Sequence, residues 1–253
     1  MSEKDIEIKM KDGVCDAVLY EADGGKKLPG VIHYPDIMGI RPSHRAMAKR
    51  LSEAGYTVML VNPFYRTARG KTFDFPPNFG GDPRTMQRFA ELTAPLTPDA
   101  IASDAETFIN FLAAQPSVSA AKIGAVGYCY TGQTALRTAA KRPDRIGAIA
   151  SFHGGRLFLD GPDSPHLVLP RIPKSAGPQL YFAHAVKDHS MPAEMIEKFD
   201  GALKSWGGNY ESEVYTDALH GFTVPDEKSH VYNKPQAERA FNKMTAMFAA
   251  ALV

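Results

Sequence analysis

The feature that most limits how this chain can fold is a regular alternation of short apolar segments with longer amphipathic ones. The apolar segments predict strands at 30–34, 57–61, 123–126, 146–151, 179–183 and 211–215. The longer segments predict helices, such as the one beginning at Pro98, which places Ile101, Ala105, Phe108 and Leu112 on one face. This alternation is typical of an α/β fold, in which a mostly parallel sheet carries helices on both faces. The segment 6–20, with a turn at 11–13, predicts an N-terminal β-hairpin before that pattern begins.

Two segments interrupt the alternation. Residues 62–98 are rich in aromatic residues, proline and glycine, with one short helix expected from Asp82-Pro83, and residues 153–177 also read as a loop. Both follow strands, so we expect lid-like loops at the carboxyl end of the sheet, where open α/β sheets bind ligands. Surface loops with apolar residues packed inward are the alternative. The length of 253 residues fits one domain, residues 1–253.

The charge balance excludes several classes of partner. Twenty-nine basic and 28 acidic residues give a net charge of +1, which offers nucleic acid or an anionic membrane no electrostatic attraction. Neither a secretory signal nor an apolar run long enough to cross a bilayer is expected, and we predict a cytoplasmic protein. Its two cysteines, Cys15 and Cys129, lie too far apart in sequence to indicate a disulfide framework or a metal site.

The strongest local signal for chemistry is Gly127-Tyr-Cys129-Tyr-Thr-Gly132, between an apolar strand and a helix. A nucleophile at such a junction sits on a tight turn whose neighbouring glycines let the strand and helix approach each other. The following helix N-terminus favours a thiolate and a developing oxyanion. An inert buried cysteine is the simpler reading, but this context favours a nucleophile. We expect the N–H groups of Tyr130 and, from the earlier loop, of Ile37 to form the oxyanion hole.

Two more residues follow later strands, in the order that a catalytic triad requires. Asp188 comes after the strand at 179–183, and His220 comes after the strand at 211–215. His220 can exchange a proton with sulfur, and Asp188 can orient the imidazole and stabilise its charged form. Asp188 could instead cap the next helix. His153, at the end of another strand, is the rival base; His220 is preferred because it alone follows the last strand.

These motifs make the chain similar to the dienelactone hydrolase (carboxymethylenebutenolidase) family, a branch of the α/β-hydrolases. The resemblance runs from about Leu28 to Phe248, and it is carried by the Cys129 motif, by the Asp188 segment ending at Pro192 and by His220-Gly-Phe. It implies an α/β-hydrolase fold and a cysteine nucleophile. It also implies an acidic residue beside the nucleophile, usually glutamate, and Asp36 occupies that position.

The same resemblance implies arginines that hold a substrate carboxylate. Arg84 or Arg88 could match one of them, although both could equally lie on a solvated helix face. The other matching position is Val224, which cannot bind a carboxylate. Tyr65 and His153 are further candidates for contact with substrate. Arginines of the two long loops could also rebuild a carboxylate site, namely Arg66, Arg69, Arg156 and Arg171.

The sequence therefore predicts a hydrolase that cleaves a small carboxylic ester or lactone through a Cys129 acyl-enzyme, without a metal or an organic cofactor. We expect a monomer or homodimer that acts on a small molecule. Two alternatives stay open. One is a thioesterase or peptidase on the same fold, and the other is a non-catalytic ligand-binding or thiol redox-sensing protein.

Overall fold

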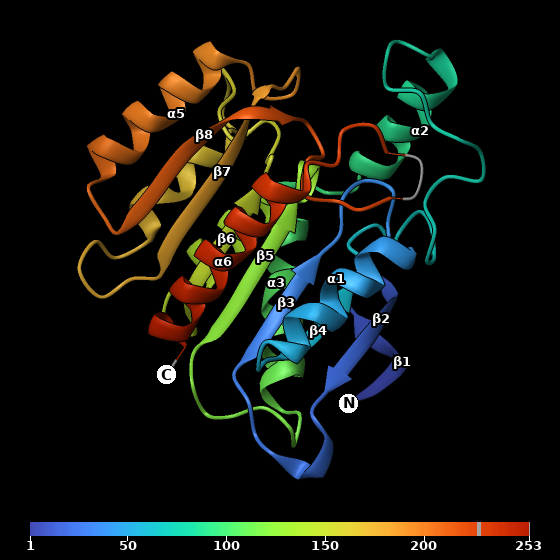
Figure 1. The fold of residues 1–253 in the computed structure, drawn as a ribbon, viewed down its shortest axis with the longest axis vertical. Coiled ribbons are helices and arrows are strands. Elements are labelled where there is room, and N and C mark those ends of the chain that lie inside the picture. The colour runs from blue at the N-terminus through green and yellow to red at the C-terminus, as the bar shows by residue number, and fades with distance from the viewer. Residues whose placement is uncertain (227–228, 253) are drawn as a thin grey trace.

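The computed structural model describes residues 1–226 and 229–252, and these contain one eight-stranded sheet (Figure 1). Its strand order is β1-β2-β4-β3-β5-β6-β7-β8. The strands are β1 (Ser2–Met10), β2 (Gly13–Glu21), β3 (Gly30–Tyr34), β4 (Thr57–Val61), β5 (Ile123–Tyr128), β6 (Ile146–Phe152), β7 (Gln179–Lys187) and β8 (Tyr210–Leu219). The first two form an antiparallel hairpin, β2 pairs antiparallel with β4, and β3 to β8 are mutually parallel. The predicted hairpin and mostly parallel sheet are confirmed.

Helices cover both faces of this sheet. They are α1 (Pro42–Glu53), α2 (Pro83–Thr93), α3 (Pro98–Ala113), α4 (Gly132–Lys141), α5 (Ala193–Trp206) and α6 (Lys234–Ala251). The short 3₁₀ helices are η1 (Asp23–Gly25), η2 (Cys129–Thr131) and η3 (Pro165–Arg171). One apolar core lies under α1 and α6, and a second lies under α3, α4 and α5 (Figure 1). Strands β3, β4, β5 and β6 are buried on both sides, which explains their nearly continuous apolar sequences.

The parallel strands bring their carboxyl ends to one edge, and the segments that follow them make the candidate site. Helix α1 begins at Pro42 with Arg41 as N-cap, so Ser43 lies inside the helix. Asp82 does cap α2, because its carboxylate accepts a hydrogen bond from the N–H of Thr85 at 2.8 Å. In the described part of the chain, no helix is both long and apolar enough to cross a membrane.

Candidate active site

The turn between β5 and α4 holds Cys129 in an uncommon backbone conformation. Cys129 has φ +55°, in the left-handed region that costs a non-glycine residue about 1 kcal/mol or more. A Cβ on Gly127 would lie 2.2 Å from the carbonyl oxygen of Thr131, and one on Gly132 would lie 2.3 Å from the Ser151 Oγ. Both glycines are therefore needed for the turn. It leaves Cys129 half-buried at the start of the 3₁₀ helix η2.

The hydroxyl of Thr131 ties this turn to the loop after β3. Thr131 Oγ1 accepts a hydrogen bond from the N–H of Tyr128 at 3.0 Å. It also lies 3.0 Å from the carbonyl oxygen of Tyr34 and 2.9 Å from that of Pro35, and its single proton can be donated to one acceptor at a time. The side chain of Thr131 thereby holds the loop after β3 beside the turn.

That arrangement brings the two expected backbone donors to the same end of the sheet. Tyr130 is the second residue of η2, where a helical N–H has no acceptor within its own helix. Ile37 is the second residue of the turn closed by the hydrogen bond from Gly39 N to Asp36 O, 3.0 Å. Both donors therefore belong to short turns fixed by hydrogen bonds of neighbouring residues, as an oxyanion hole requires.

A histidine–carboxylate pair lies at the ends of β7 and β8. Asp188 follows β7 and His220 follows β8, and His220 Nδ1 is 2.7 Å from Asp188 Oδ2. The other carboxylate oxygen, Oδ1, accepts hydrogen bonds from the N–H and the hydroxyl of Ser190, at 2.8 and 2.6 Å. Helix α5 begins only at Ala193, and no side chain caps it. Asp188 therefore holds His220 by a hydrogen bond and does not cap α5, which was the alternative.

The charges around this pair favour the ionised form of both partners. Burial alone would lower the pKa of His220, but Cys129 and Asp188 outweigh it and raise that pKa well above its usual value. Cys129 contributes both charge and a side-chain hydrogen bond to this effect, so the sulfur and Asp188 act on the same imidazole. Burial would raise the pKa of Asp188, yet the hydrogen bonds from His220 and Ser190 lower it. The sequence order Cys129, Asp188, His220 is thus brought together in space.

The rival histidine has a different environment. His153 is buried, its Nε2 is 2.9 Å from Thr223 Oγ1, and its ring packs edge-on against His220 with 5.1 Å between ring centres. Burial, assisted by the nearby His220, lowers the pKa of His153 to about 3. His153 is therefore neutral at physiological pH and packs against the ring of His220.

Asp36 has its carboxylate held by neighbours from its own loop and from α1. Arg41 donates two hydrogen bonds to the two oxygens, at 2.7 and 2.8 Å, and His44 Nε2 lies 3.2 Å from Oδ2. Burial would raise the pKa of Asp36, but His44 and Arg41 hold it well below its usual value. Among the hydrogen bonds of the described residues, none joins this carboxylate to Cys129. Its position beside the nucleophile stays a prediction.

Comparison with known proteins shows the family of this chain. The model of the dienelactone hydrolase family matches residues 15–252. The chain belongs to the dienelactone hydrolase family. A Synechocystis protein assigned as a carboxymethylenebutenolidase is 26% identical over 220 residues, which are 87% of this chain and 85% of the relative. A protein assigned as a 2-oxo-3-(5-oxofuran-2-ylidene)propanoate lactonase, from Bradyrhizobium, is 23% identical over 78% of this chain and 74% of its own.

Solved structures show the same fold. A protein from Klebsiella pneumoniae assigned as a dienelactone hydrolase has a TM-score of 0.82 at 20% identity, covering 98% of both chains. A dienelactone hydrolase-like promiscuous phosphotriesterase from metagenomic libraries has a TM-score of 0.78 at 20% identity, covering 100% of this chain and 99% of its own. Membership of the dienelactone hydrolase family and this α/β-hydrolase fold make the chain a hydrolase.

In this member of the dienelactone hydrolase family, the segment 62–98 forms an apolar wall beside the turn that holds Cys129. Four residues of this segment, Phe64, Phe73, Leu92 and Leu96, form one apolar cluster with Ile37 and Ile101. Cys129 and Tyr130 pack against this cluster, and the rings of Phe89 and Tyr130 meet edge-on at 5.8 Å. The expected lid-like loop thus contains α2 and covers the Cys129 turn from one side.

The candidate substrate contacts fall in different places. Arg88 donates a hydrogen bond to the carbonyl oxygen of Thr72 at 2.9 Å and pairs with Glu91 at 3.0 Å. The exposed side chain of Arg84 stacks on the ring of Phe75, 3.8 Å from its centre. Both arginines lie on α2. Arg84 is on the solvated face of this helix, and Arg88 is bonded to Thr72 and Glu91.

Tyr65 does not reach the candidate site. It is buried in the core beside the hairpin, and its hydroxyl donates a hydrogen bond to Asp104 at 2.9 Å. The expectation that Tyr65 contacts substrate is therefore wrong, because its hydroxyl and its ring are both used inside the fold. From the sequence, an aromatic residue early in a long loop could equally contact substrate or be buried in the core.

Three functional neighbours escaped the sequence reasoning. Arg41 pairs with Asp36 and, through Nε and Nη2, with both oxygens of Asp226 at 2.9 and 2.7 Å. Asp226 is 185 residues away from Arg41 in the chain, so no local pattern could indicate this contact. Ser190 was detectable, since a serine two residues after an aspartate commonly bonds back to it. In the described residues no cluster of three or more His, Cys, Asp or Glu side chains could hold a metal ion.

Proposed function

We propose that this protein hydrolyses small carboxylic esters or lactones through a thioester formed on Cys129. The observation that carries the proposal is the shared imidazole, since His220 interacts with Cys129 on one side and lies 2.7 Å from Asp188 on the other. This is the arrangement that activates a weak nucleophile. The names of the family relatives, which are lactone hydrolases, support the same substrate class.

The proposed reaction has two halves. The sulfur of Cys129 attacks the substrate carbonyl carbon, and its proton resides on His220, whose charged form Asp188 stabilises. The N–H groups of Ile37 and Tyr130 stabilise the oxyanion, and each such donor contributes about 10²–10³ in rate. The carbon–oxygen bond then breaks as His220 protonates the leaving oxygen. Water attacks the thioester with His220 as base, which releases the acid and regenerates the thiol.

We further propose that the substrate is neutral or only weakly polar at its far end. The wall beside Cys129 is apolar, Val224 is 3% exposed in the core under α1 and α6, and Arg88 already bonds Thr72 and Glu91. A carboxylate left unpaired in such a pocket would be costly. Arg156 is the feature that argues against a neutral substrate. Burial raises the pKa of Tyr130 and the charge of Arg156 lowers it, so this positive charge acts on the residue next to Cys129.

The first experiment tests the nucleophile. Time-resolved mass spectrometry with p-nitrophenyl acetate should show an acetyl group on Cys129 that turns over, and Cys129→Ala should lack both the adduct and turnover. His220→Ala should lose several orders of magnitude in kcat/KM, whereas His153→Ala should lose much less. Substantial turnover by Cys129→Ala, or equal losses for the two histidines, would contradict the assignment.

We also propose a reducing compartment such as the cytoplasm, where Cys129 stays a thiol.

The second experiment tests the substrate. A lactone with a free carboxylate and its methyl ester should be compared by kcat/KM, with the methyl ester expected to be the better substrate. A charged hydrogen bond is worth roughly ten- to a hundredfold in rate. Preference for the free acid, lost in Arg88→Ala or Arg156→Ala, would show that a carboxylate site exists and would identify the arginine.

A further inference from the structure

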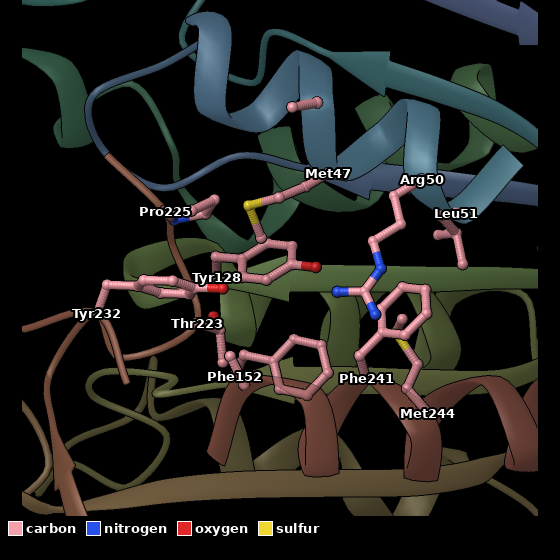
Figure 2. A pocket seen from close by; sticks show the side chains of 12 residues that line it. Met47, Arg50, Leu51, Tyr128, Phe152, Thr223, Pro225, Tyr232, Phe241 and Met244 are labelled. Carbon is pink, nitrogen blue, oxygen red and sulfur yellow. The ribbon is translucent and has the colours of Figure 1, made fainter. Parts of the chain in front are cut away.

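A hollow of about 130 Å³ lies between α1 and α6, on the face of the sheet covered by these two helices (Figure 2). Helix α1 packs on β4 and β2, and α6 packs on β6, β7 and β8, so β3 and β5 run between the two helices. Neighbouring strands are about 4.8 Å apart and packed helices about 8–10 Å apart, so these helices cannot close over both strands. Side chains fill this gap only in part.

The walls of the hollow are aromatic and polarisable. Twelve residues line it: Ala46, Met47, Arg50, Leu51, Tyr128, Phe152, Thr223, Pro225, Tyr232, Ala237, Phe241 and Met244. Figure 2 shows the hydroxyl of Tyr128 inside the hollow, on the side toward Arg50. Burial raises the pKa of Tyr128, so this hydroxyl stays protonated and can donate a hydrogen bond. Thioether and aromatic walls of this kind suit a flat, unsaturated ring.

The charges at the rim compensate one another. Arg50 pairs with both oxygens of Glu238, at 2.8 and 2.5 Å, and its guanidinium lies 3.8 Å from the centre of the Phe241 ring. A cation in the hollow would meet Arg50, and an anion would have to compete with Glu238 for the same guanidinium. The pair therefore favours an uncharged occupant.

The hollow is separate from the proposed acyl site but adjacent to it. Cys129 packs against the apolar cluster of the 62–98 segment, whereas the hollow belongs to the core under α1 and α6. Tyr128 directly precedes Cys129, and Thr223 bonds His153, whose ring packs against His220. An occupant would thus touch residues one step away from the nucleophile and from the histidine.

We propose that this hollow binds a small neutral aromatic molecule with one hydrogen-bonding group, of the size of phenol. The volume supports this size, because an apolar cavity of about 150 Å³ accommodates benzene. Tyr128 supplies the hydrogen bond, the aromatic and methionine side chains supply the walls, and the mouth between the helices supplies the entry. A ligand of seven non-hydrogen atoms is expected to bind with a Kd of about 0.1–5 mM.

The test uses protein carrying ¹³C-methyl methionine, since Met47 and Met244 line the hollow while Met38 lies in the cluster beside Cys129. Titration with phenol should shift the Met47 and Met244 signals saturably. Ala46→Phe, which places a ring at the mouth, should abolish the shifts. Ala246→Phe should preserve them, because Ala246 is an exposed α6 residue outside the hollow, whereas Ala46 is an exposed α1 residue that lines it.

Two further comparisons make the outcome specific. Tyr128→Phe should weaken phenol about three- to tenfold, the effect of one lost hydrogen bond, and should leave toluene unchanged. Benzoate should bind at least tenfold more weakly than phenol. The proposal is overturned by shifts that do not saturate, by equal binding to Ala46→Phe, by a response at Met38 alone, or by benzoate binding as tightly as phenol.

Discussion

Replacing Asp188 by asparagine isolates the charge of the acid in the proposed triad. Asparagine keeps a hydrogen-bond acceptor for His220 Nδ1 but removes the negative charge that lies 2.7 Å away. Two unit charges about 4 Å apart interact by roughly 4 kcal/mol at an effective dielectric constant of 20. The His220 side chain is 31% exposed, so screening reduces that figure. We expect the imidazolium to lose about 2–3 kcal/mol of stabilisation, or about 30- to 150-fold in kcat/KM.

The assay is steady-state hydrolysis of p-nitrophenyl acetate, with unfolding followed in parallel. Ser190→Ala is the matched control, because it removes one hydrogen bond from an uncharged donor and leaves the charge of the Asp188 carboxylate in place, so it should cost less than Asp188→Asn. A loss below fivefold for Asp188→Asn, or a loss confined to KM, would refute the reasoning, since a charge that stabilises the imidazolium must act on kcat.

The same pair predicts how stability depends on pH. Because the pKa of His220 is higher in the folded than in the unfolded protein, this residue stabilises the fold fully at pH values below its unfolded-state pKa. That stability is lost as the pH rises through its folded-state pKa. The lowered pKa of Asp188 adds stability above its unfolded value that is lost as pH falls. The difference in unfolding free energy between wild type and Asp188→Asn should therefore be largest between about pH 4 and 6.5. A difference that grows steadily up to pH 9 would contradict these signs.

The remaining predictions concern the turn and the loop after β3. Cys129→Gly should be about 0.5–1 kcal/mol more stable than Cys129→Ala in denaturant titrations, because glycine adopts φ +55° without strain; equal stabilities would argue against strain. Gly132→Ala should cost more than 3 kcal/mol or prevent folding, whereas Gly201→Ala on α5, where a Cβ meets nothing within 4 Å, should be neutral or stabilising. Asp36→Asn should raise the rate of Cys129 alkylation by iodoacetamide at neutral pH, since the position proposed for Asp36 puts its negative charge near the thiol; an unchanged or slower rate would count against this placement.

The sequence was most informative where function depends on local pattern. Alternating strands and helices determined the sheet, and the glycines at 127 and 132 indicated the tight turn because no larger residue fits there. Chain order then placed Asp188 and His220 after adjacent strands of a parallel sheet, whose carboxyl ends necessarily lie together. These inferences need only the topology of the fold.

The contacts between distant loops could not be predicted in this way. The pairing of Arg41 with Asp226, the buried contact of Tyr65 with Asp104 and the hollow beside Tyr128 all depend on where side chains from separate crossovers meet. Such meetings are set by packing in three dimensions, and sequence spacing carries no record of them.

Arg41 has a consequence for how the site can move. Its guanidinium bonds Asp36 in the loop after β3 and Asp226 in the segment after His220, with four hydrogen bonds of 2.7–2.9 Å. Neither segment can lift away without breaking two of them, so the two should open as one unit. In the wild type, local opening should therefore expose the loop after β3 and the segment after His220 to solvent at the same rate. In Arg41→Met, amide hydrogen exchange should become faster in both segments.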